Sequence, residues 1–302
     1  MKQYLIGIDG GASRSRAVLT DLKGAMVASA EGLSLNPLSI GWEAFQVHFK
    51  QLIAGLPITE SGEVKALCAG LAGSGREEVR LRAEKEIAAL LKAERVFVIS
   101  DALAALWGAF HEGAGLLLIA GTGSICLGRD EDGNTARSGG FGRLLGDEGG
   151  GYWIAMEAIK AVLRSTDGRG SAGSLIQAVK EMFDLDDVRD AIPLVYNGTF
   201  SPEKIAAFAE KVLPLSKTDP TAARIVADAG RCLAELIIAT AEKLELENPK
   251  VALWGGLWRL AGEELQEALS DALKKLAFDC EICLPAESPE WGAIRYLKHK
   301  LA

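Results

Sequence analysis

Residues 4–21, YLIGIDGGASRSRAVLTD, contain two apolar segments separated by glycines and small polar residues. Such a connection is typical of a β-hairpin, in which glycine permits a positive φ. The same turn also suits an anion, because its backbone N–H groups can face the ligand and Ser13 adds a hydroxyl. Asp9 then lies where a carboxylate can hold a hydrated Mg²⁺. The stretch therefore predicts either a plain hairpin or a phosphate-binding turn.

A second copy of this pattern occurs at residues 116–128, LLLIAGTGSICLG. An apolar run breaks at Gly121-Thr122-Gly123-Ser124 and then resumes. Two such turns favour phosphate binding over two unrelated hairpins. A nucleotide held between two glycine and hydroxyl hairpins, each opening a separate domain, is the arrangement of actin-like ATPases and sugar kinases. The chain resembles that superfamily.

Composition limits the class of protein and its partners. The 302 residues are 49% apolar and carry a formal net charge of −8. This balance gives no broad positive surface, so neither nucleic acid nor a membrane is expected as a partner. Apolar runs are too short to span a bilayer and the N-terminus lacks a signal-peptide pattern, which predicts a cytoplasmic protein.

The cysteines and histidines predict no metal cage. Five cysteines in such a chain indicate reduced thiols rather than a disulfide framework. Cys280 and Cys283 form a lone C-x-x-C in an apolar stretch, with no second pair for a zinc site. The three histidines are scattered and do not have the spacing of metal ligands. Strand packing is therefore the simpler role for the cysteine pair.

The hydrophobic pattern predicts an α/β protein with two RNase H-like domains, a cleft between them and a helical insertion in the second. The first domain is expected at 1–112 plus 286–302, and the second at 113–285 with its insertion at about 150–245. Strands are predicted at 4–9, 16–21, 25–30, 64–71, 95–99, 116–120, 124–129, 134–138, 250–254 and 278–284. Helices are predicted at 41–54, 76–92, 102–111, 151–164, 172–183, 186–196, 201–213, 219–246 and 262–276. A last helix, beginning near SPEWGAIRYL, is expected to return to the first domain.

Two further motifs follow predicted strands. VALWGGLWR, residues 251–259, ends a strand in Gly255-Gly256, which fits either a plain strand-to-helix turn or a close approach to a nucleoside. VISDALAALWGAF, residues 98–110, places Asp101 between a strand and a helix. Asp101 can cap that helix, act as a general base toward a sugar hydroxyl, or do both.

The most distinctive segment is RSGGFGRLLGDEGGGYWIAMEAIKAV, residues 137–162. Its glycines are too many for an ordinary connection and indicate that backbone approaches another group closely. Asp147 and Glu148 precede a helix. An interaction with the helix dipole explains these acids but not the glycines.

Together, GLSLN, GLAGSG, SDALAAL, AGTGS, SGGFG and GDEGGGYW resemble the N-acetylglucosamine kinase and BadF/BadG/BcrA/BcrD ATPase family, from the first strand to the last helix. The resemblance implies ATP and Mg²⁺ as cofactors, with Asp101 as catalytic base and Asp9 at the metal. It implies an amino-sugar site formed by Asn36, Ser74, Asp101, Gly140 and Asp147. It implies phosphate contacts from Gly10, Gly11, Ser13, Gly121, Thr122, Gly123 and Ser124, and adenosine contacts from Gly255 and Gly256.

Three positions depart from the family pattern. The first turn reads GGAS where GGGT is usual, Phe141 stands where the kinases often have Trp, and Gly150 stands where Ser is frequent. The last two adjoin the expected sugar pocket, so they bear on the substrate's N-substituent more than on the chemistry.

The resemblance implies an ATP-dependent kinase that forms a sugar 6-phosphate, closes a hinge around its substrate and assembles as a homodimer. N-acetylglucosamine is the leading substrate, with glucosamine and N-acetylmuramic acid as rivals. A BadF-type ATPase activator, with an iron–sulfur cluster bridging a dimer, is an alternative. However, Cys68, Cys126 and Cys232 lie in apolar segments and are expected in the core. A non-catalytic sugar sensor is disfavoured because Asp101 is present and no DNA-binding segment is attached.

Overall fold

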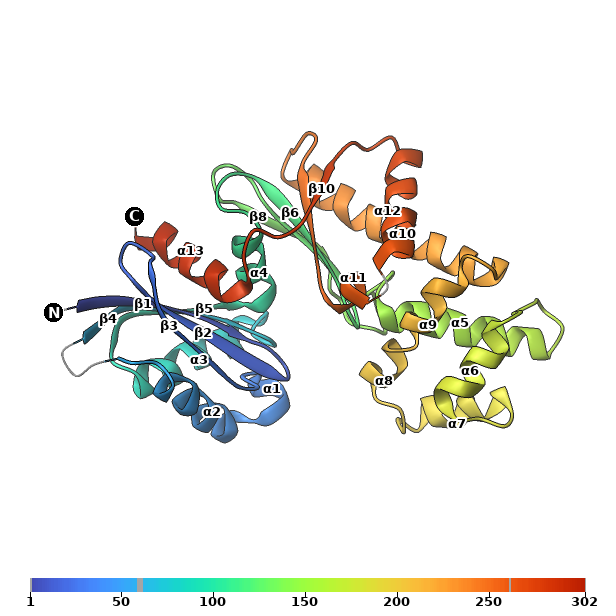
Figure 1. Cartoon of the computed structure of the whole chain (residues 1–302), viewed down its shortest axis with the longest axis horizontal. Coiled ribbons are helices and arrows are strands. Elements are labelled where there is room, and N and C mark those ends of the chain that lie inside the picture. The colour runs from blue at the N-terminus through green and yellow to red at the C-terminus, as the bar shows by residue number, and fades with distance from the viewer. Residues whose placement is uncertain (1, 59–61, 261, 302) are drawn as a thin grey trace. The chain divides into compact units, whose positions relative to one another are not determined.

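The computed structural model describes residues 2–58, 62–260 and 262–301. Its contacts divide the chain into two compact units, Met1–Gly113 with Pro285–Ala302, and Ala114–Leu284. Each unit contains a mixed five-stranded sheet with helices packed against it (Figure 1). The predicted α/β class with two such sheets is confirmed. No helix in the described ranges is both long and apolar enough to cross a bilayer.

The first unit is built on a sheet of strand order β3-β2-β1-β4-β5. Strands β2 and β3 run antiparallel in a meander with β1, and β4 and β5 run parallel to β1. The register places Gly10, Leu71 and Ser100 level with one another at the carboxyl ends of the parallel strands. The strands are β1 (Lys2–Gly10), β2 (Arg14–Asp21), β3 (Met26–Leu33), β4 (Gly62–Leu71) and β5 (Ala93–Ser100).

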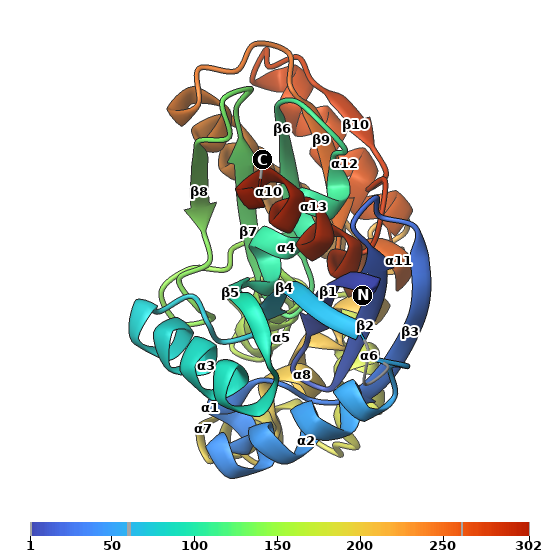
Figure 2. The same cartoon turned by 90° about the vertical axis from the view of Figure 1, so that its left-hand side faces the viewer.

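Helices cover both faces of this sheet. Figure 2 shows α4 and α13 side by side, with α2 and α3 on the other side of the strands. Successive residues of a strand point to opposite faces. Ile6 and Ile8 of β1 accordingly pack in the core with α2 and α3, whereas Leu5 packs with Ile294 of α13. The helices are α1 (Pro37–Ile40), α2 (Trp42–Ala54), α3 (Glu77–Leu90), α4 (Asp101–Ala109) and α13 (Pro289–Leu301).

Glycine allows α4 and α13 to pack closely. A Cβ on Gly292 would lie 1.9 Å from the carbonyl oxygen of Ala104, and one on Gly108 would lie 2.8 Å from that of Ser288. Both distances are too short for a real side chain. The final helix therefore packs in the first unit through positions that tolerate only glycine.

The second unit repeats the same sheet. Its order is β10-β9-β6-β7-β8, with β7 and β8 antiparallel in a meander with β6, and β9 and β10 parallel to β6. This matches the first sheet strand for strand. The strands are β6 (Gly115–Ala120), β7 (Ser124–Arg129), β8 (Thr135–Gly139), β9 (Lys250–Trp254) and β10 (Glu281–Cys283).

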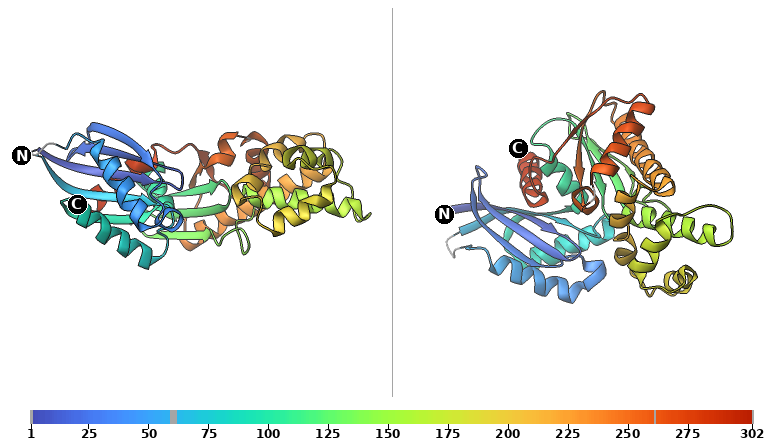
Figure 3. Two further views of the ribbon diagram at one scale, coloured as in Figure 1. Left: turned by 90° about the horizontal axis from the view of Figure 1, so that it is seen from below. Right: turned by 45° about the vertical axis from the view of Figure 1, so that its right-hand side comes forward.

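Most helices of the second unit lie between β8 and β9. Asp219 caps α10, because its side chain accepts from the N–H groups of Thr221 and Ala222, and Pro220 follows it. In Figure 3 the yellow-green to gold helices of this unit gather away from its strands. The helices are α5 (Gly151–Thr166), α6 (Leu175–Phe183), α7 (Ala191–Tyr196), α8 (Pro202–Ala206), α9 (Ala209–Leu215), α10 (Pro220–Lys243), α11 (Gly256–Leu260) and α12 (Gly262–Lys275).

Two predicted helices are interrupted, and one short helix was not predicted. The predicted helix 41–54 is α2, and Gly41, with φ +79°, separates it from the unpredicted α1. The predicted helix 186–196 consists of the 3₁₀ turn η1 (Val188–Asp190) followed by α7. The predicted helix 201–213 is divided into α8 and α9. Each change affects a boundary and leaves the order of elements intact.

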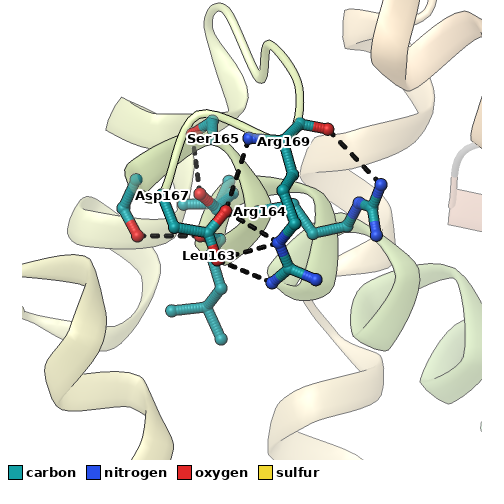
Figure 4. Close-up of polar contacts among 7 residues, drawn as sticks. Leu163, Arg164, Ser165, Asp167 and Arg169 are labelled. Carbon is teal, nitrogen blue, oxygen red and sulfur yellow. Dashed lines mark hydrogen bonds and ion pairs between the residues drawn. The ribbon is translucent and has the colours of Figure 1, made fainter.

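The turn after α5 is held by its own polar groups (Figure 4). Arg169 donates through Nε and Nη2 to the carboxylate of Asp167, at 2.9 and 2.6 Å. The main-chain N–H of Arg169 donates to the carbonyl of Arg164, whose own guanidinium donates back to the carbonyl of Arg169. These groups are exposed, so they order the turn and contribute little to stability.

Candidate active site

The first glycine turn joins β1 to β2. The N–H of Gly11 donates to the carbonyl of Arg14 at 3.0 Å, which closes the turn. The N–H groups of Ala12 and Ser13 make no hydrogen bond within the described part of the chain, and both side chains are exposed. Two adjacent free N–H donors with a hydroxyl beside them suit an anionic oxygen.

The glycines of this turn do not supply a positive φ, so that interpretation of the hairpin is wrong. They provide space instead. A Cβ on Gly10 would lie 2.4 Å from the side chain of Leu71, and one on Gly11 would lie 2.9 Å from the carbonyl of Arg14. The side chain of Leu71 and the carbonyl of Arg14 leave no room for a Cβ at these two positions.

The second glycine turn joins β6 to β7 and rests on the start of α5. The N–H of Gly121 donates to the carbonyl of Gly123 at 2.9 Å. The carbonyls of Gly121 and Thr122 accept from the N–H groups of Gly151 and Tyr152, at 2.8 and 2.9 Å. No described residue pairs with the N–H groups of Thr122 and Gly123, and the Thr122 side chain is exposed. Each unit thus presents a turn with two adjacent free donors.

Two of the predicted contact residues use their hydroxyls inside the protein. Ser124 is buried, and its Oγ donates to the carbonyl of Glu148 at 2.7 Å. Ser74 is buried, and its Oγ lies 2.7 Å from the carbonyl oxygen of Leu71 and 2.9 Å from that of Ile99. These hydroxyl groups hold loops in place. The contacts of Ser124 with phosphate and of Ser74 with the sugar stay predictions.

The predicted adenosine segment lies beside the second turn. Strands β6 and β9 pair in parallel with Ile119 opposite Trp254, so the next residue, Gly255, reaches Ala120. Gly255 has φ +118°, and a Cβ there would lie 2.2 Å from the carbonyl oxygen of Ala120. Gly256, which begins α11, has no atom within 4 Å of such a Cβ. Only Gly255 is required by the packing.

The glycine-rich segment after β8 also packs on the second turn. A Cβ on Gly150 would lie 2.6 Å from the carbonyl carbon of Gly123. A Cβ on Gly123 would in turn lie 2.2 Å from Oδ2 of Asp147. Gly140 has φ +71°, and Asp147 itself has φ +58°, which is uncommon outside glycine. The close approach expected for these glycines is, within this unit, an approach to the phosphate turn.

Asp147 is held in this unusual conformation by the loop. Its Oδ1 accepts from the N–H of Gly142 at 3.2 Å. Burial raises the pKa of its carboxyl, and this effect outweighs that hydrogen bond. Asp147 thus links the glycine-rich segment to the second turn.

Asp101 begins α4 at the carboxyl edge of the first sheet. Its Oδ1 accepts from the N–H of Ala102 at 2.8 Å. The helix cap is Ser100, whose Oγ accepts from the N–H of Leu103 at 3.1 Å, so the interpretation of Asp101 as the N-cap is wrong. Burial raises the pKa of Asp101, which makes its carboxylate a stronger base.

Asp9 lies near Asp101 at the same edge. The pKa of Asp9 is raised to about 6, first by burial and then by the negative charges of Glu290 and Asp101, which outweigh the nearby Arg16 and Arg14. No three His, Cys, Asp or Glu side chains in the described ranges are placed to hold a metal ion by themselves. Mg²⁺ fits here nonetheless, because it keeps most of its waters and needs only one or two carboxylates besides phosphate.

Two of the segments expected to hold the sugar, those of Asn36 and Ser74, meet in the first unit. Oδ1 of Asn36 accepts from the N–H of Leu38 at 3.0 Å and caps α1. Gly73, with φ +81°, leaves room for this amide, since a Cβ there would lie 2.6 Å from Asn36 Oδ1. The N–H of Ala72 donates to the carbonyl of Gly10 at 2.8 Å, which connects this segment to the first turn. Asn36 and Asp9 are thereby placed by connected loops.

Sequence reasoning missed two residues near this edge, Ser100 and Glu290. Ser100 stands one position from an acid that seemed a sufficient cap. Glu290 belongs to the last helix, and only the packing of α13 on β1 brings it to Asp9.

Comparisons with known proteins agree on one family. The chain is 34% identical over 255 residues to an N-acetylmuramic acid/N-acetylglucosamine kinase of Clostridium acetobutylicum, covering 83% of each chain. It is 31% identical over 314 residues to an N-acetyl-D-glucosamine kinase of Dictyostelium discoideum, covering 97% of each.

Solved structures share the fold. A candidate N-acetylglucosamine kinase of Chromobacterium violaceum matches with a TM-score of 0.74 and 27% identity, over 96% of this chain and 97% of the other. A ROK family glucokinase of Streptomyces griseus, in complex with glucose and AMPPNP, matches with a TM-score of 0.58 and 16% identity over 96% and 97% of the two chains. This second likeness concerns the fold alone.

The family model for BadF/BadG/BcrA/BcrD ATPases matches residues 6–294, which includes every segment described above. The protein is therefore a member of the BadF/BadG/BcrA/BcrD ATPase family.

Proposed function

We propose that the protein is a sugar kinase that transfers the γ-phosphate of ATP to the 6-hydroxyl of N-acetylglucosamine or a close relative. The observation that supports this best is the environment of Asp101. Its carboxylate is largely buried at the carboxyl edge of the parallel strands, has a raised pKa and lies near Asp9. A base of this kind beside a metal-binding carboxylate is what transfer to an alcohol requires.

Asp101 serves as the general base in this proposal. A sugar hydroxyl is a weak nucleophile at neutral pH, so it must lose its proton as it attacks phosphorus. Oδ1 of Asp101 is oriented by the Ala102 N–H, and Oδ2 lies outside the hydrogen bonds formed by the described residues. The carboxylate therefore has an oxygen available for the hydroxyl proton.

The two turns and the adenosine segment hold ATP. The free N–H groups of Ala12, Ser13, Thr122 and Gly123 donate to phosphate oxygens, and Gly255 and Gly256 bring the backbone close to the nucleoside. Asp9 holds Mg²⁺ through its water ligands. When bound, the ion neutralises charge on the transferring phosphate.

The substrate class follows from the relatives' names, which include kinases of N-acetylglucosamine, N-acetylmuramic acid and, in Vibrio cholerae at 29% identity, glucosamine. We place N-acetylglucosamine first. Asn36 and the loop from Gly140 to Asp147 contact the amino sugar. Phe141, with 63% of its surface exposed, is the side chain of this loop best suited to pack on an apolar N-substituent.

Cys68 and Cys126 do not support the alternative role as a cluster-carrying activator, whereas Cys232, which was also predicted in the core, is only half-buried. Cys68 and Cys126 have no exposed surface, and burial raises the pKa of both thiols. Such thiols stay protonated and do not bind iron readily. A purified protein that does not absorb visible light would agree with the absence of an iron–sulfur cluster.

Mg²⁺-dependent ADP formation tests the function. The panel contains N-acetylglucosamine, glucosamine, N-acetylmuramic acid, N-acetylmannosamine and glucose, with a no-sugar control. We expect one amino sugar to stimulate turnover and its product to carry phosphate at the 6-position by ³¹P and proton NMR. Hydrolysis that is independent of sugar, or no turnover, would reject the proposal. Light scattering of the same sample tests the expected homodimer.

A further inference from the structure

The N-terminus of α13 lies directly on β1 next to Asp9. A Cβ on Gly7 would lie 2.2 Å from the main-chain carbonyl oxygen of Glu290, so the two backbones are in contact there. Side chains two residues apart on a strand share a face. The side chain of Asp9 therefore points to the same face of the sheet as the contact at Gly7, which is the face that α13 covers. Asp9 lies two residues after Gly7 along β1.

Glu290 has a carboxylate with one oxygen held and one unpaired. Oε1 accepts from Oγ of Ser288 at 2.6 Å. Oε2 is buried and has no hydrogen-bond partner among the described residues. A buried oxygen without a partner costs roughly 1–3 kcal/mol, and more when it is charged. Oε2 of Glu290 is therefore free to accept a hydrogen bond from a group that the described residues do not supply.

The nearby positive charges of Arg16 and Arg14 offset the two acids only in part. The negative charge of Glu290 acts on Asp9, and both groups are acids. Of the two arginines that act on Asp9, Arg16 pairs with Glu31 at 3.2 Å in an exposed ion pair. Two neighbouring carboxylates suit a divalent cation with its water shell.

We propose that Glu290 is a second carboxylate for the hydrated Mg²⁺ that accompanies ATP, acting with Asp9. This inference rests on the proposed use of ATP. Ser288 orients the carboxylate by occupying Oε1, and Oε2 accepts a hydrogen bond from a water bound to the metal. The last helix thus contributes to the metal site as well as to the core.

The proposal predicts that Glu290→Gln stabilises the protein without metal and weakens the binding of metal in the presence of ADP. Without metal, Glu290→Gln removes a negative charge beside Asp9, so the melting temperature should rise. With Mn²⁺ and ADP, the same change removes an acceptor for metal-bound water, so metal affinity should fall. Loss of an outer-shell partner typically costs 10–100-fold in metal affinity.

The experiment measures Mn²⁺ binding to the full chain by EPR in the presence of saturating ADP, with melting temperatures recorded with and without Mn²⁺. Glu287→Gln is the matched control, because Glu287 is in the same segment but pairs with Arg295 at 2.6 and 2.7 Å. We expect Mn²⁺ to bind at least tenfold more weakly to Glu290→Gln and with wild-type affinity to Glu287→Gln.

The outcomes separate this inference from the proposed function. If the wild type binds no Mn²⁺ with ADP, the proposed use of ATP fails. If the wild type binds Mn²⁺ and Glu290→Gln binds it equally well, the role of Glu290 is overturned while the kinase proposal stands. A Glu290→Gln protein that melts lower without metal would instead indicate that the carboxylate is a structural contact.

Discussion

Gly255 offers a sharp test of how the nucleotide segments are packed, and the perturbation is Gly255→Ala. The added Cβ would lie 2.2 Å from the carbonyl oxygen of Ala120, whereas real Cβ contacts stay above 3.0 Å. The ends of β6 and β9 must therefore separate by about 0.8 Å, since neither group is a flexible side-chain end. Alanine would also have to adopt φ +118°.

The cost has two parts. A non-glycine residue in such a φ region costs on the order of 1–3 kcal/mol, and the displaced backbone adds to this. A total of about 3 kcal/mol corresponds to a melting temperature roughly 6–12 °C lower. The shift also moves Gly121, the first residue of the second turn, so we expect ADP to bind at least tenfold more weakly.

Differential scanning calorimetry and titration calorimetry with ADP measure both effects. Gly256→Ala is the control, because a Cβ there meets no atom within 4 Å. Its melting temperature should stay within about 2 °C of the wild type. If Gly255→Ala melts like the wild type, or if both variants fall equally, the packing of β9 against the second turn is not as described.

Three further predictions concern the first unit. Burial raises the pKa of Asp101, so its protonated, inactive form persists to higher pH. We therefore expect kcat/KM to fall on acidification with a midpoint above pH 3.8, the ordinary value for aspartate. A kcat/KM that does not fall on acidification until pH 3.8 or below would contradict this. Ser100→Ala should lower the free energy of unfolding by about 1 kcal/mol through loss of the α4 cap and keep activity within tenfold of the wild type. A loss of activity as large as that of Asp101→Asn would refute the assignment of Ser100 as the cap and Asp101 as the base. Gly292→Ala should destabilise by more than about 3 kcal/mol in urea unfolding, because its Cβ would meet the Ala104 carbonyl at 1.9 Å, while Gly75→Ala, with open space, should not.

The order of strands and helices could be predicted from the sequence because it depends on local patterns. Apolar alternation, glycine turns and caps such as Asp219 are properties of short segments. Helix boundaries were less predictable. The predicted helix 201–213, for example, is divided into α8 and α9, although its residues form one helical pattern.

The positions of the site loops could be predicted, but not how their side chains are used. Ser74 and Ser124 are in the predicted turns, yet their hydroxyls bond to carbonyls of residues about 25 positions away. The effect of Glu290 on Asp9 connects residues near the two ends of the sequence. Such contacts depend on long-range packing, which a motif does not encode.

The role of Asp101 is tested by one comparison, phosphoryl transfer to N-acetylglucosamine by the wild type and by Asp101→Asn, with ADP affinity measured on the same samples. The variant keeps the shape of the side chain and removes its basicity, so kcat should fall at least 100-fold, in line with the usual contribution of a general base, while ADP affinity and melting temperature stay near wild type. An Asp101→Asn protein that phosphorylates the sugar as fast as the wild type would contradict the assignment of the base.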